Sequence, residues 1–332
     1  MTEKPFRSID QQVNKLKIER GLLFENEEWD KQLLLSYGYY EIINGYKFHF
    51  MKDPTNDDAG FIDGTTFEHI YRLFSYDRFL RSQVMSALET FELSLRQALA
   101  YTIAEQISDK QDIYLSRKNY VTGKKQYNRS AQKSTYPIDH LLEILTKITY
   151  TTSEPFKHYR EEHHNIPPWI IVKKLNFGNL IWWYRLLKKK EKNLVVARML
   201  GENVNLIDQT PDLKDAFSNL LSLYLDYRNT AAHGGRIYNH FSEHHELSFN
   251  RLLHSILGVS SADYRNGKGK SKIGVVLKSL QIFENNDPYN ELKLGISVYL
   301  KNYLKLYPQD KDYLLATMEL TEDDLRLDLT KQ

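Results

Sequence analysis

Residues 67–107 read FEHIYRLFSYDRFLRSQVMSALETFELSLRQALAYTIAEQI, and this stretch decides the fold class. Apolar residues recur in it at spacings of three and four, the periodicity of an α-helix with one buried face. No proline or glycine interrupts the pattern. The stretch therefore predicts one long helix, or two helices in near continuity. The apolar positions are Ile70, Leu73, Phe74, Leu80, Val84, Leu88, Phe91, Leu95, Ala98 and Leu99.

The same helical periodicity continues over most of the chain, whereas strand alternation is rare. The sequence therefore predicts an all-α bundle. Its expected parts are an N-terminal helical region at 1–60, a main helical domain at 61–257 and a C-terminal helical extension at 258–332. Outside the long stretch, helices are predicted at 8–20, 27–36, 138–149, 178–188, 213–233, 247–257, 272–283, 288–306 and 310–318.

The composition describes a globular chain with little net charge. Of its 332 residues 41% are hydrophobic, enough for one large or two modest domains. The formal charge is only +2, so a nucleic-acid site would have to be a local patch. The lack of cysteine excludes disulfides, zinc fingers and thiol nucleophiles. No apolar run approaches the ~18 to 20 residues of a membrane span, so we expect a cytoplasmic protein without a membrane partner.

The stretch 226–240, DYRNTAAHGGRIYNH, places polar residues at the end of a predicted helix. At about 100° per residue, Asp226, Asn229 and His233 fall within an arc of about 60° on one side. The glycine pair 234–235 then ends the helix, because glycine adopts the left-handed conformation without penalty. The opposite, core-facing side is apolar and consists of Leu213, Leu220, Leu223, Tyr224, Tyr227 and Ala231.

A guanidinium beside an imidazole suits phosphodiester chemistry. An imidazole such as that of His233 can take or give a proton near neutral pH. Arg228, at the edge of the polar arc, could bind a phosphate bidentately, and Asn229 could orient the imidazole or donate to the phosphate. RNA carries its own nucleophile in the 2′-hydroxyl, so such a site needs neither metal nor cofactor. The alternative is a helix cap with a solvated face, and spacing alone does not decide between them.

Three other groups of residues each allow two interpretations. Glu89, Glu92 and Arg96 share one helix face and form either a surface ion-pair row or a wall of the catalytic cleft. The clustered histidines could hold a metal, although no carboxylate arrangement completes a known site. They are His240, His244 and His245.

The stretch 108–136 is polar, basic and aperiodic, so it predicts an exposed excursion or lid, and 264–272 is a second basic stretch. Such stretches are usually solvated loops. Interleaved with tyrosines, they could instead grip RNA by phosphate contacts and base stacking. The tyrosines are Tyr114, Tyr120, Tyr127, Tyr136 and Tyr264. The candidate RNA-binding residues are Arg117, Lys118, Lys124, Lys125, Arg129, Lys133, Lys268 and Lys270.

Four short motifs follow one another within residues 10–240. They are Gly38, Tyr39, Tyr40, Gly45 and Tyr46; Asp77, Arg78, Leu80 and Arg81, with Glu89, Glu92 and Arg96 beyond them; Pro167, Trp169, Phe177, Gly178 and Leu180; and Arg228, Asn229, His233, Arg236 and Asn239. In this order the chain resembles the Abi-like (AbiD/AbiF-type) abortive-infection proteins of bacteria, which belong to the HEPN superfamily of helical RNases.

The resemblance implies a HEPN-type helical bundle in which Arg228 and His233 are the catalytic pair and Asn229 supports them. Sites of this type are usually composite, with two Arg-His motifs facing each other. This chain contains no second such motif, so the resemblance implies a homodimer. The further residues expected to support the site are Asp226, Arg236, Asn239, Glu89, Glu92 and Arg96.

The leading hypothesis is a metal-independent endoribonuclease that acts as a toxin-like effector of bacterial phage defence. The alternative is a non-catalytic RNA-binding protein that holds a structured small noncoding RNA. A third hypothesis, from a different class, is a metal hydrolase built on the histidine cluster. Cleavage of RNA in the presence of a chelator separates the first from the other two.

Overall fold

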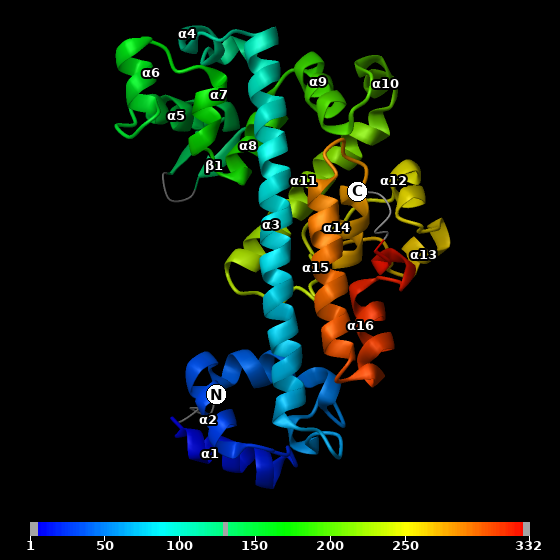
Figure 1. Ribbon diagram of the computed structural model, residues 1–332. Coiled ribbons are helices and arrows are strands. Elements are labelled where there is room, and N and C mark those ends of the chain that lie inside the picture. The colour runs from blue at the N-terminus through cyan, green and yellow to red at the C-terminus, as the bar shows by residue number, and fades with distance from the viewer. Residues whose placement is uncertain (1–5, 129–131, 328–332) are drawn as a thin grey trace.

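The computed structural model describes residues 6–128 and 132–327 and confirms the all-α prediction (Figure 1). The stretch that decides the fold class is one continuous helix, α3 (Phe67–Gln106). It begins where the Thr66 side chain accepts the His69 backbone N–H at 3.1 Å, an N-cap. Its apolar positions are buried along the whole length, so the other helices assemble around α3.

The N-terminal region packs on the first turns of α3. Phe24 stacks on Phe67 with ring centroids 5.4 Å apart, and Leu23 pairs with Thr66 through backbone hydrogen bonds. The predicted helix at 8–20 is α1 (Ile9–Asn14), continued as a π-helical turn, η1 (Lys15–Glu19). The region continues with α2 (Glu27–Tyr37), η2 (Tyr40–Asn44), η3 (Lys47–Phe50) and η4 (Asp57–Ala59).

The segment after α3 returns along the other end of that helix (Figure 1). It contains α4 (Gln111–Tyr114), η5 (Arg117–Asn119), β1 (Gln126–Asn128), β2 (Lys133–Thr135), α5 (Pro137–Thr149), α6 (Phe156–Glu162), α7 (Pro168–Ile171), η6 (Val172–Lys174), α8 (Phe177–Leu186) and α9 (Lys189–Leu200). β1 and β2 form a small antiparallel hairpin in which Tyr127 pairs with Ser134.

The prediction that all of 108–136 is an exposed excursion is wrong for its first part. Tyr114 and Tyr120 are buried, and their hydroxyls donate to the carbonyls of Ile166 and Tyr114 at 2.6 and 2.7 Å. The indole of Trp183 donates to the Tyr120 hydroxyl at 3.2 Å. Since both rings are enclosed in the core, they cannot stack on RNA bases. The lysines near these tyrosines led to the prediction of a solvated segment, whereas the buried tyrosine rings fix the first part of this segment to the core.

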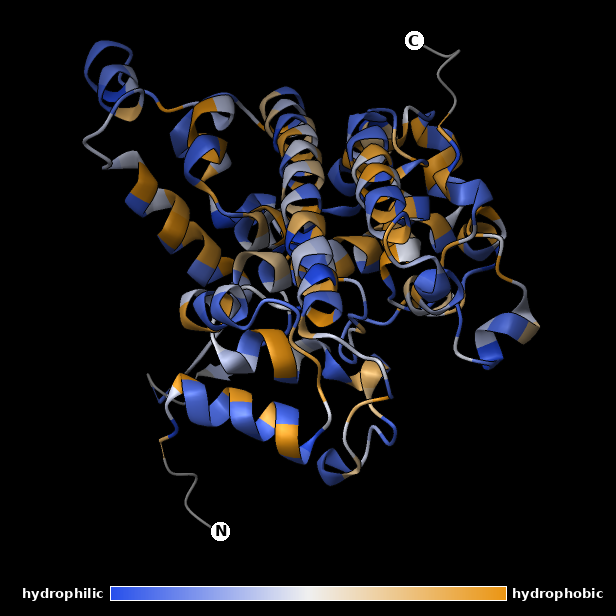
Figure 2. Cartoon of the chain, turned by 60° about the horizontal axis from the view of Figure 1, so that its bottom comes forward, coloured by the Kyte–Doolittle hydropathy of each residue, from blue (hydrophilic) through white to orange (hydrophobic). Residues whose placement is uncertain are grey.

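The remaining helices close the bundle. They are α10 (Val204–Gln209), α11 (Pro211–Ala232), α12 (Arg251–Ile256), α13 (Ser261–Arg265), α14 (Ile273–Leu280), α15 (Asp287–Leu304), η7 (Pro308–Asp310), α16 (Lys311–Met318) and η8 (Asp323–Leu325). Most helices carry both apolar and polar residues (Figure 2), and the apolar ones pack into one connected core. None of the described helices is both long and apolar enough to span a membrane.

Helix α15 lies along α3 and makes both apolar and polar contacts with it (Figure 1). Phe79 and Tyr299 stack with centroids 4.6 Å apart. The Ser86 hydroxyl donates to the Glu291 carboxylate at 3.2 Å. At Gly295 a Cβ would lie 2.4 Å from the Gln83 side chain, so a larger residue would force that side chain to move.

A carboxylate with two histidine partners joins the C-terminal part to the N-terminal region. The Nε2 atoms of His49 and His69 lie 3.0 and 2.7 Å from the two oxygens of Asp310, and the Tyr303 hydroxyl also donates to it. Burial opposes ionisation of Asp310, but these hydrogen bonds outweigh burial and hold its pKa below the usual range. The cluster therefore fixes the α15–α16 turn against the start of α3.

Replacing Gly274 by alanine tests how tightly α14 packs against the end of α16. A Cβ at this position would lie 2.2 Å from the Glu319 carbonyl oxygen and 2.6 Å from that of Met318. Because backbone must move to make room, we expect Gly274→Ala to lower the free energy of unfolding by about 1–3 kcal/mol in urea denaturation. Gly178→Ala is the matched control, since its Cβ would meet only ordinary contacts at 3.5 Å. Equal stability of both variants would contradict this packing.

Asp30 gives the fold a specific pH dependence. Burial, reinforced by the charges of Glu68 and Glu25, raises the pKa of Asp30 to about 6. A raised carboxyl pKa favours the protonated form in the folded state, so stability is full below about pH 4 and falls as the pH rises through 6. Asp30→Asn should therefore be more stable than wild type at pH 8 and lose that advantage at pH 4. Urea unfolding at pH 4 and pH 8 measures the difference in stability between Asp30→Asn and the wild type, and the exposed Asp58→Asn is the control. The same difference in unfolding free energy at both pH values would contradict the burial effect.

Candidate functional site at the end of helix α11

Helix α11 presents the two predicted faces. Leu220, Leu223, Tyr224, Tyr227 and Ala231 are buried, which confirms the core-facing stripe; Leu213, nearer the start of the helix, is only half-buried. On the other side, Asn229 and His233 are exposed to solvent. The helix therefore delivers an amide and an imidazole to the surface at its C-terminal end.

Gly234 and Gly235 form the turn that ends helix α11. His233 is the C-cap of α11, and Gly234 follows it with a φ of +77°, the left-handed conformation. The Gly235 N–H donates to the Thr230 carbonyl at 2.8 Å and the Gly234 N–H to that of Ala231 at 3.3 Å, the Schellman pattern of helix termination. A Cβ on Gly235 would lie 2.6 Å from the Thr230 side chain. The glycines thus stop the helix directly after His233 and fix its backbone.

The chain after the glycines is held by a buried carboxylate of α3. Asp77 is fully buried, and its oxygens accept the backbone N–H groups of Ile237 at 3.0 Å and Tyr238 at 2.7 Å. The Tyr46 hydroxyl donates to it at 2.6 Å and the Arg81 guanidinium at 3.2 Å. Burial raises the pKa of the Asp77 carboxyl, and these four donors counter the shift. Asp77 therefore fastens the segment behind His233 to the central helix.

Two arginines complete this anchor. Arg81 also reaches the Gly235 carbonyl at 3.4 Å. Arg236, one of the residues expected to support the site, donates to the Gly45 carbonyl at 2.6 Å. The rings of Tyr46 and Tyr238 stack at 5.8 Å. Motif residues from three distant parts of the sequence thus meet in one cluster, whose position behind His233 indicates an anchoring role.

Sequence reasoning did not assign this role to Asp77, although a signal for it exists. Asp77 follows Leu73 by four residues and precedes Leu80 by three, so it lies on the apolar stripe of α3. A carboxylate on a core-facing stripe must find donors inside the protein. Apart from Arg81, four residues further along α3, its partners could not be named from the sequence, because they lie 31 and 160 residues away.

Arg228 differs from the other arginines of this protein. Its side chain is partly buried and its Nε is enclosed, yet within residues 6–128 and 132–327 no atom offers it a hydrogen bond or an ion pair. Every other buried or partly buried arginine in these ranges has such a partner, as Arg185 does with Ser222 and Arg198 with Glu105. An arginine held in place without an internal partner can receive an anion from outside.

Asp226 is less available than its place on the polar arc predicts. Its carboxylate lies 2.7 Å from Nε2 of His240, and both side chains are mostly covered. The His240 ring also packs edge-on against Tyr227, with centroids 4.8 Å apart. The pair therefore ties the segment beyond the glycines back to α11. In the described part of the chain, no three histidine, aspartate or glutamate side chains are grouped so that they could hold a metal ion.

Glu92 and Arg96 do not form an exposed ion-pair row, so that interpretation is wrong for them. Glu92 is buried at 6% exposure and accepts a hydrogen bond from Arg96. Arg96 also donates to the Leu175 carbonyl at 2.8 Å, just before the start of α8. The pair thus joins α3 to the Phe177–Gly178 motif, while Glu89 on the same helix is exposed.

A family model described as Abi-like protein matches residues 32–239. The chain belongs to the Abi-like protein family. The matched range includes the N-terminal tyrosine segment, α3, α8 and the whole of α11 with its Arg228–His233 end. No curated protein and no solved structure is detectably similar to the chain. Membership in the Abi-like family connects the chain with abortive infection, a form of phage defence.

The predicted RNA-binding residues of this Abi-like chain lie in two places. Lys118, Lys124 and Lys125 are exposed around the small hairpin, whereas Arg117 is paired with Asp139 at 2.8 Å. Lys133 belongs to β2, and Arg129 lies outside the described residues. In the second place, Lys268 and Lys270 lie near carboxylates and are partly neutralised by them. These contacts are Lys268 with Asp263 at 3.8 Å and Lys270 with Glu246 at 3.1 Å.

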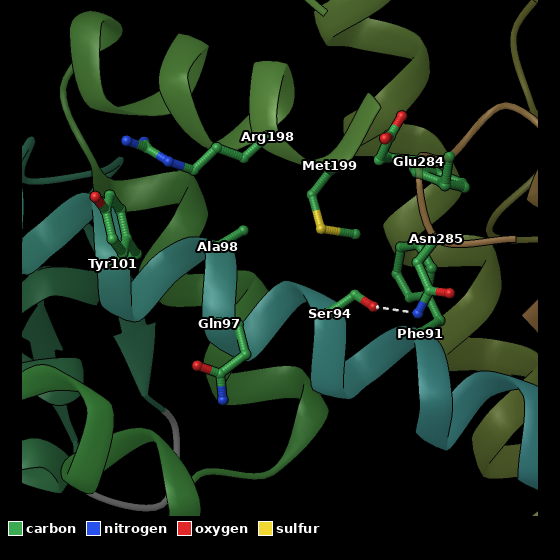
Figure 3. A pocket seen from close by; sticks show the side chains of 10 residues that line it. Phe91, Ser94, Gln97, Ala98, Tyr101, Arg198, Met199, Glu284 and Asn285 are labelled. Atoms are coloured by element: carbon green, nitrogen blue, oxygen red, sulfur yellow. Dashed lines mark hydrogen bonds between the residues drawn. The ribbon is translucent and has the colours of Figure 1, made fainter. Parts of the chain in front are cut away.

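A cavity of about 390 Å³ lies elsewhere, between α3, α9 and the turn before α15 (Figure 3). Its walls are mainly apolar, with Ser94 and Asn285 hydrogen-bonded at 3.0 Å on one side. Among the residues that line it are Phe91, Tyr101 and Met199, but none of the candidate catalytic residues. This cavity is therefore separate from the Arg228–His233 end of α11, where His233 is exposed.

Asp77→Asn tests the anchor behind His233. An amide has a single acceptor oxygen and turns an NH₂ group toward the donors, so at least one buried hydrogen bond is lost. We expect a loss of about 2–4 kcal/mol of unfolding free energy and faster hydrogen exchange at the Ile237 and Tyr238 amides. Asp226→Asn, which alters the partly exposed pair with His240, should cost less than about 1 kcal/mol. Equal losses for both variants would contradict the special role of Asp77.

Proposed function

We propose that this Abi-like protein is a metal-independent endoribonuclease that acts as the toxin-like effector of a phage-defence response. The single observation that carries the proposal is the unpartnered, partly buried Arg228 guanidinium on the same helix end as the exposed His233. The Schellman turn and the Asp77 anchor hold the backbone of that end, so the two side chains are presented by a fixed support. Family membership supports the biological setting.

In the proposed reaction the 2′-hydroxyl of RNA attacks the adjacent phosphorus. A general base removes the hydroxyl proton, the 2′-oxygen–phosphorus bond forms, and the bond to the 5′-oxygen breaks as a general acid protonates that oxygen. The products are a 2′,3′-cyclic phosphate and a free 5′-hydroxyl. His233 serves in proton transfer, Arg228 offsets the charge on the phosphoryl oxygens, and Asn229 positions either group. DNA lacks the attacking hydroxyl and should not be cut.

The reaction needs an acid and a base at once, and each chain offers one Arg228–His233 pair. We therefore extend the proposal to a homodimer in which two copies of the exposed α11 end face each other. One His233 would act as the base and the partner's His233 as the acid. Light scattering gives the molecular mass in solution; a monomer with full RNA-cleaving activity would overturn the dimeric site without touching the assignment of Arg228.

Cleavage of single-stranded RNA in the presence of EDTA tests the activity. We expect His233→Ala and Arg228→Ala to reduce the cleavage rate by about 10²-fold or more, because proton transfer and charge stabilisation each contribute on that scale. His244→Ala is the matched control, since this exposed histidine lies outside the motif and should leave the rate unchanged. The cyclic-phosphate end of the product identifies the route through the 2′-hydroxyl.

The competing function is that of a non-catalytic RNA-binding protein holding a small noncoding RNA. Lys118, Lys124 and Lys125 are exposed and have no hydrogen-bond or ion-pair partner among the described residues, which is compatible with either function. Purification under low salt followed by sequencing of bound RNA separates the two. If RNA copurifies and the His233→Ala and Arg228→Ala variants cleave RNA as well as the wild type, the nuclease proposal is overturned and the RNA-binding function is supported.

A further inference from the structure

Two cations that the proposed chemistry does not use lie where α8, α9 and α11 meet (Figure 1). Arg185 is in the last turn of α8, and Lys192 follows in the first half of α9. The packing of Tyr184 against Phe217, with ring centroids 5.2 Å apart, holds the end of α8 on the middle of α11. Both cations are therefore carried on rigid helices.

Arg185 is positioned by neutral groups only. Its Nη2 donates to the Ser222 hydroxyl at 2.5 Å and to the Ser218 carbonyl at 3.2 Å. Burial lowers the pKa of the Arg185 guanidinium, which records a charge held in a poorly solvated place. Among the described residues no carboxylate lies within ion-pair distance of it. Its remaining N–H groups are oriented by the serines but not neutralised.

Lys192 adds a second charge beside it. The ammonium group is half-buried and has no hydrogen-bond or ion-pair partner within the described ranges. Burial, followed by the nearby positive charge of Arg185, lowers the pKa of Lys192. Two like charges side by side destabilise each other unless an anion joins them. Two other basic residues of α9 have partners, since Lys189 pairs with Asp208 and Arg198 with Glu105, at 2.8 and 2.7 Å.

Arg185 is held on the face of α11 that carries the candidate catalytic side chains. Ser222, which holds Arg185, precedes Asn229 by seven residues and His233 by eleven, so all three fall within about 40° on α11. At 1.5 Å per residue, the distances along the axis are about 10 and 16 Å. A strand of RNA whose scissile phosphate lies at His233 would reach Arg185 a few nucleotides away.

We infer that Arg185 and Lys192, with the hydroxyl of Ser222, form a phosphate-binding subsite that holds the RNA backbone away from the cleavage point. The inference rests on the proposed nuclease function and adds the position at which the substrate is gripped. Arg185 supplies oriented N–H donors, Lys192 a mobile point charge, and the phosphate neutralises both. Because the subsite contacts a phosphate and no base, it selects RNA by its length and single-stranded backbone and not by its base sequence.

Binding of a short fluorescein-labelled single-stranded RNA, followed by fluorescence anisotropy, tests the subsite. The full-length His233→Ala protein serves as background so that the probe stays intact. We expect Lys192→Gln to weaken binding about tenfold and to lower the slope of log Kd against log salt by about 0.7, the value for one phosphate contact on a single strand. Lys190→Gln is the matched control, because this exposed lysine on the same helix should leave affinity and slope unchanged.

The outcomes distinguish the subsite from the nuclease proposal. If the wild type cleaves RNA but Lys192→Gln binds it with unchanged affinity and salt slope, the subsite is wrong and the nuclease stands. If the unmodified chain neither binds nor cleaves RNA, both fall. A second experiment measures the melting temperature after addition of inorganic phosphate. If phosphate raises the melting temperature of the wild type but not of Lys192→Gln, while both bind RNA with equal affinity, the site holds a free anion, and the RNA subsite is overturned.

Discussion

The buried carboxylate of Asp77 is the interaction on which the geometry of the candidate site depends. A fully buried carboxyl group is unfavourable unless donors surround it, and Asp77 receives four, from Tyr46, Arg81, Ile237 and Tyr238. Two of these donors are backbone amides of the segment that follows His233. The central helix, the N-terminal region and the end of α11 are therefore joined at one point.

This anchor explains how an exposed histidine at a helix end can be held in a defined place. Helix ends are usually mobile, because their last turn lacks hydrogen-bond partners. Here the Schellman turn closes α11 at Gly234, and the next residues are fastened to α3. The candidate catalytic groups thus stand on rigid elements, although they face solvent, which is the arrangement that a polymeric substrate requires.

The positive side chains around α11 divide into two kinds. Arg81, Arg96 and Arg236 are bound by carboxylates or carbonyls and support the fold. Arg228 and Lys192 are partly buried without internal partners in the described chain. Placing a cation in a poorly solvated position without a partner costs stability, and such sites are commonly kept for a ligand. The two kinds of cation differ in their partners and not in the amount of charge.

The sequence by itself determined the helical class, a long helical stretch at 67–106 and the two faces of α11, because these follow from local periodicity. It also placed Arg228, Asn229 and His233 together, since they share one helix end. Only the tertiary structure decided that Arg236 and Glu92 are anchoring residues, that Tyr114 and Tyr120 are buried, and that Asp226 is paired with His240. Those outcomes depend on tertiary contacts, such as Arg236 with Gly45, 191 residues away, and Tyr114 with Ile166, 52 residues away, and local patterns carry no information about which donor or acceptor a side chain will meet.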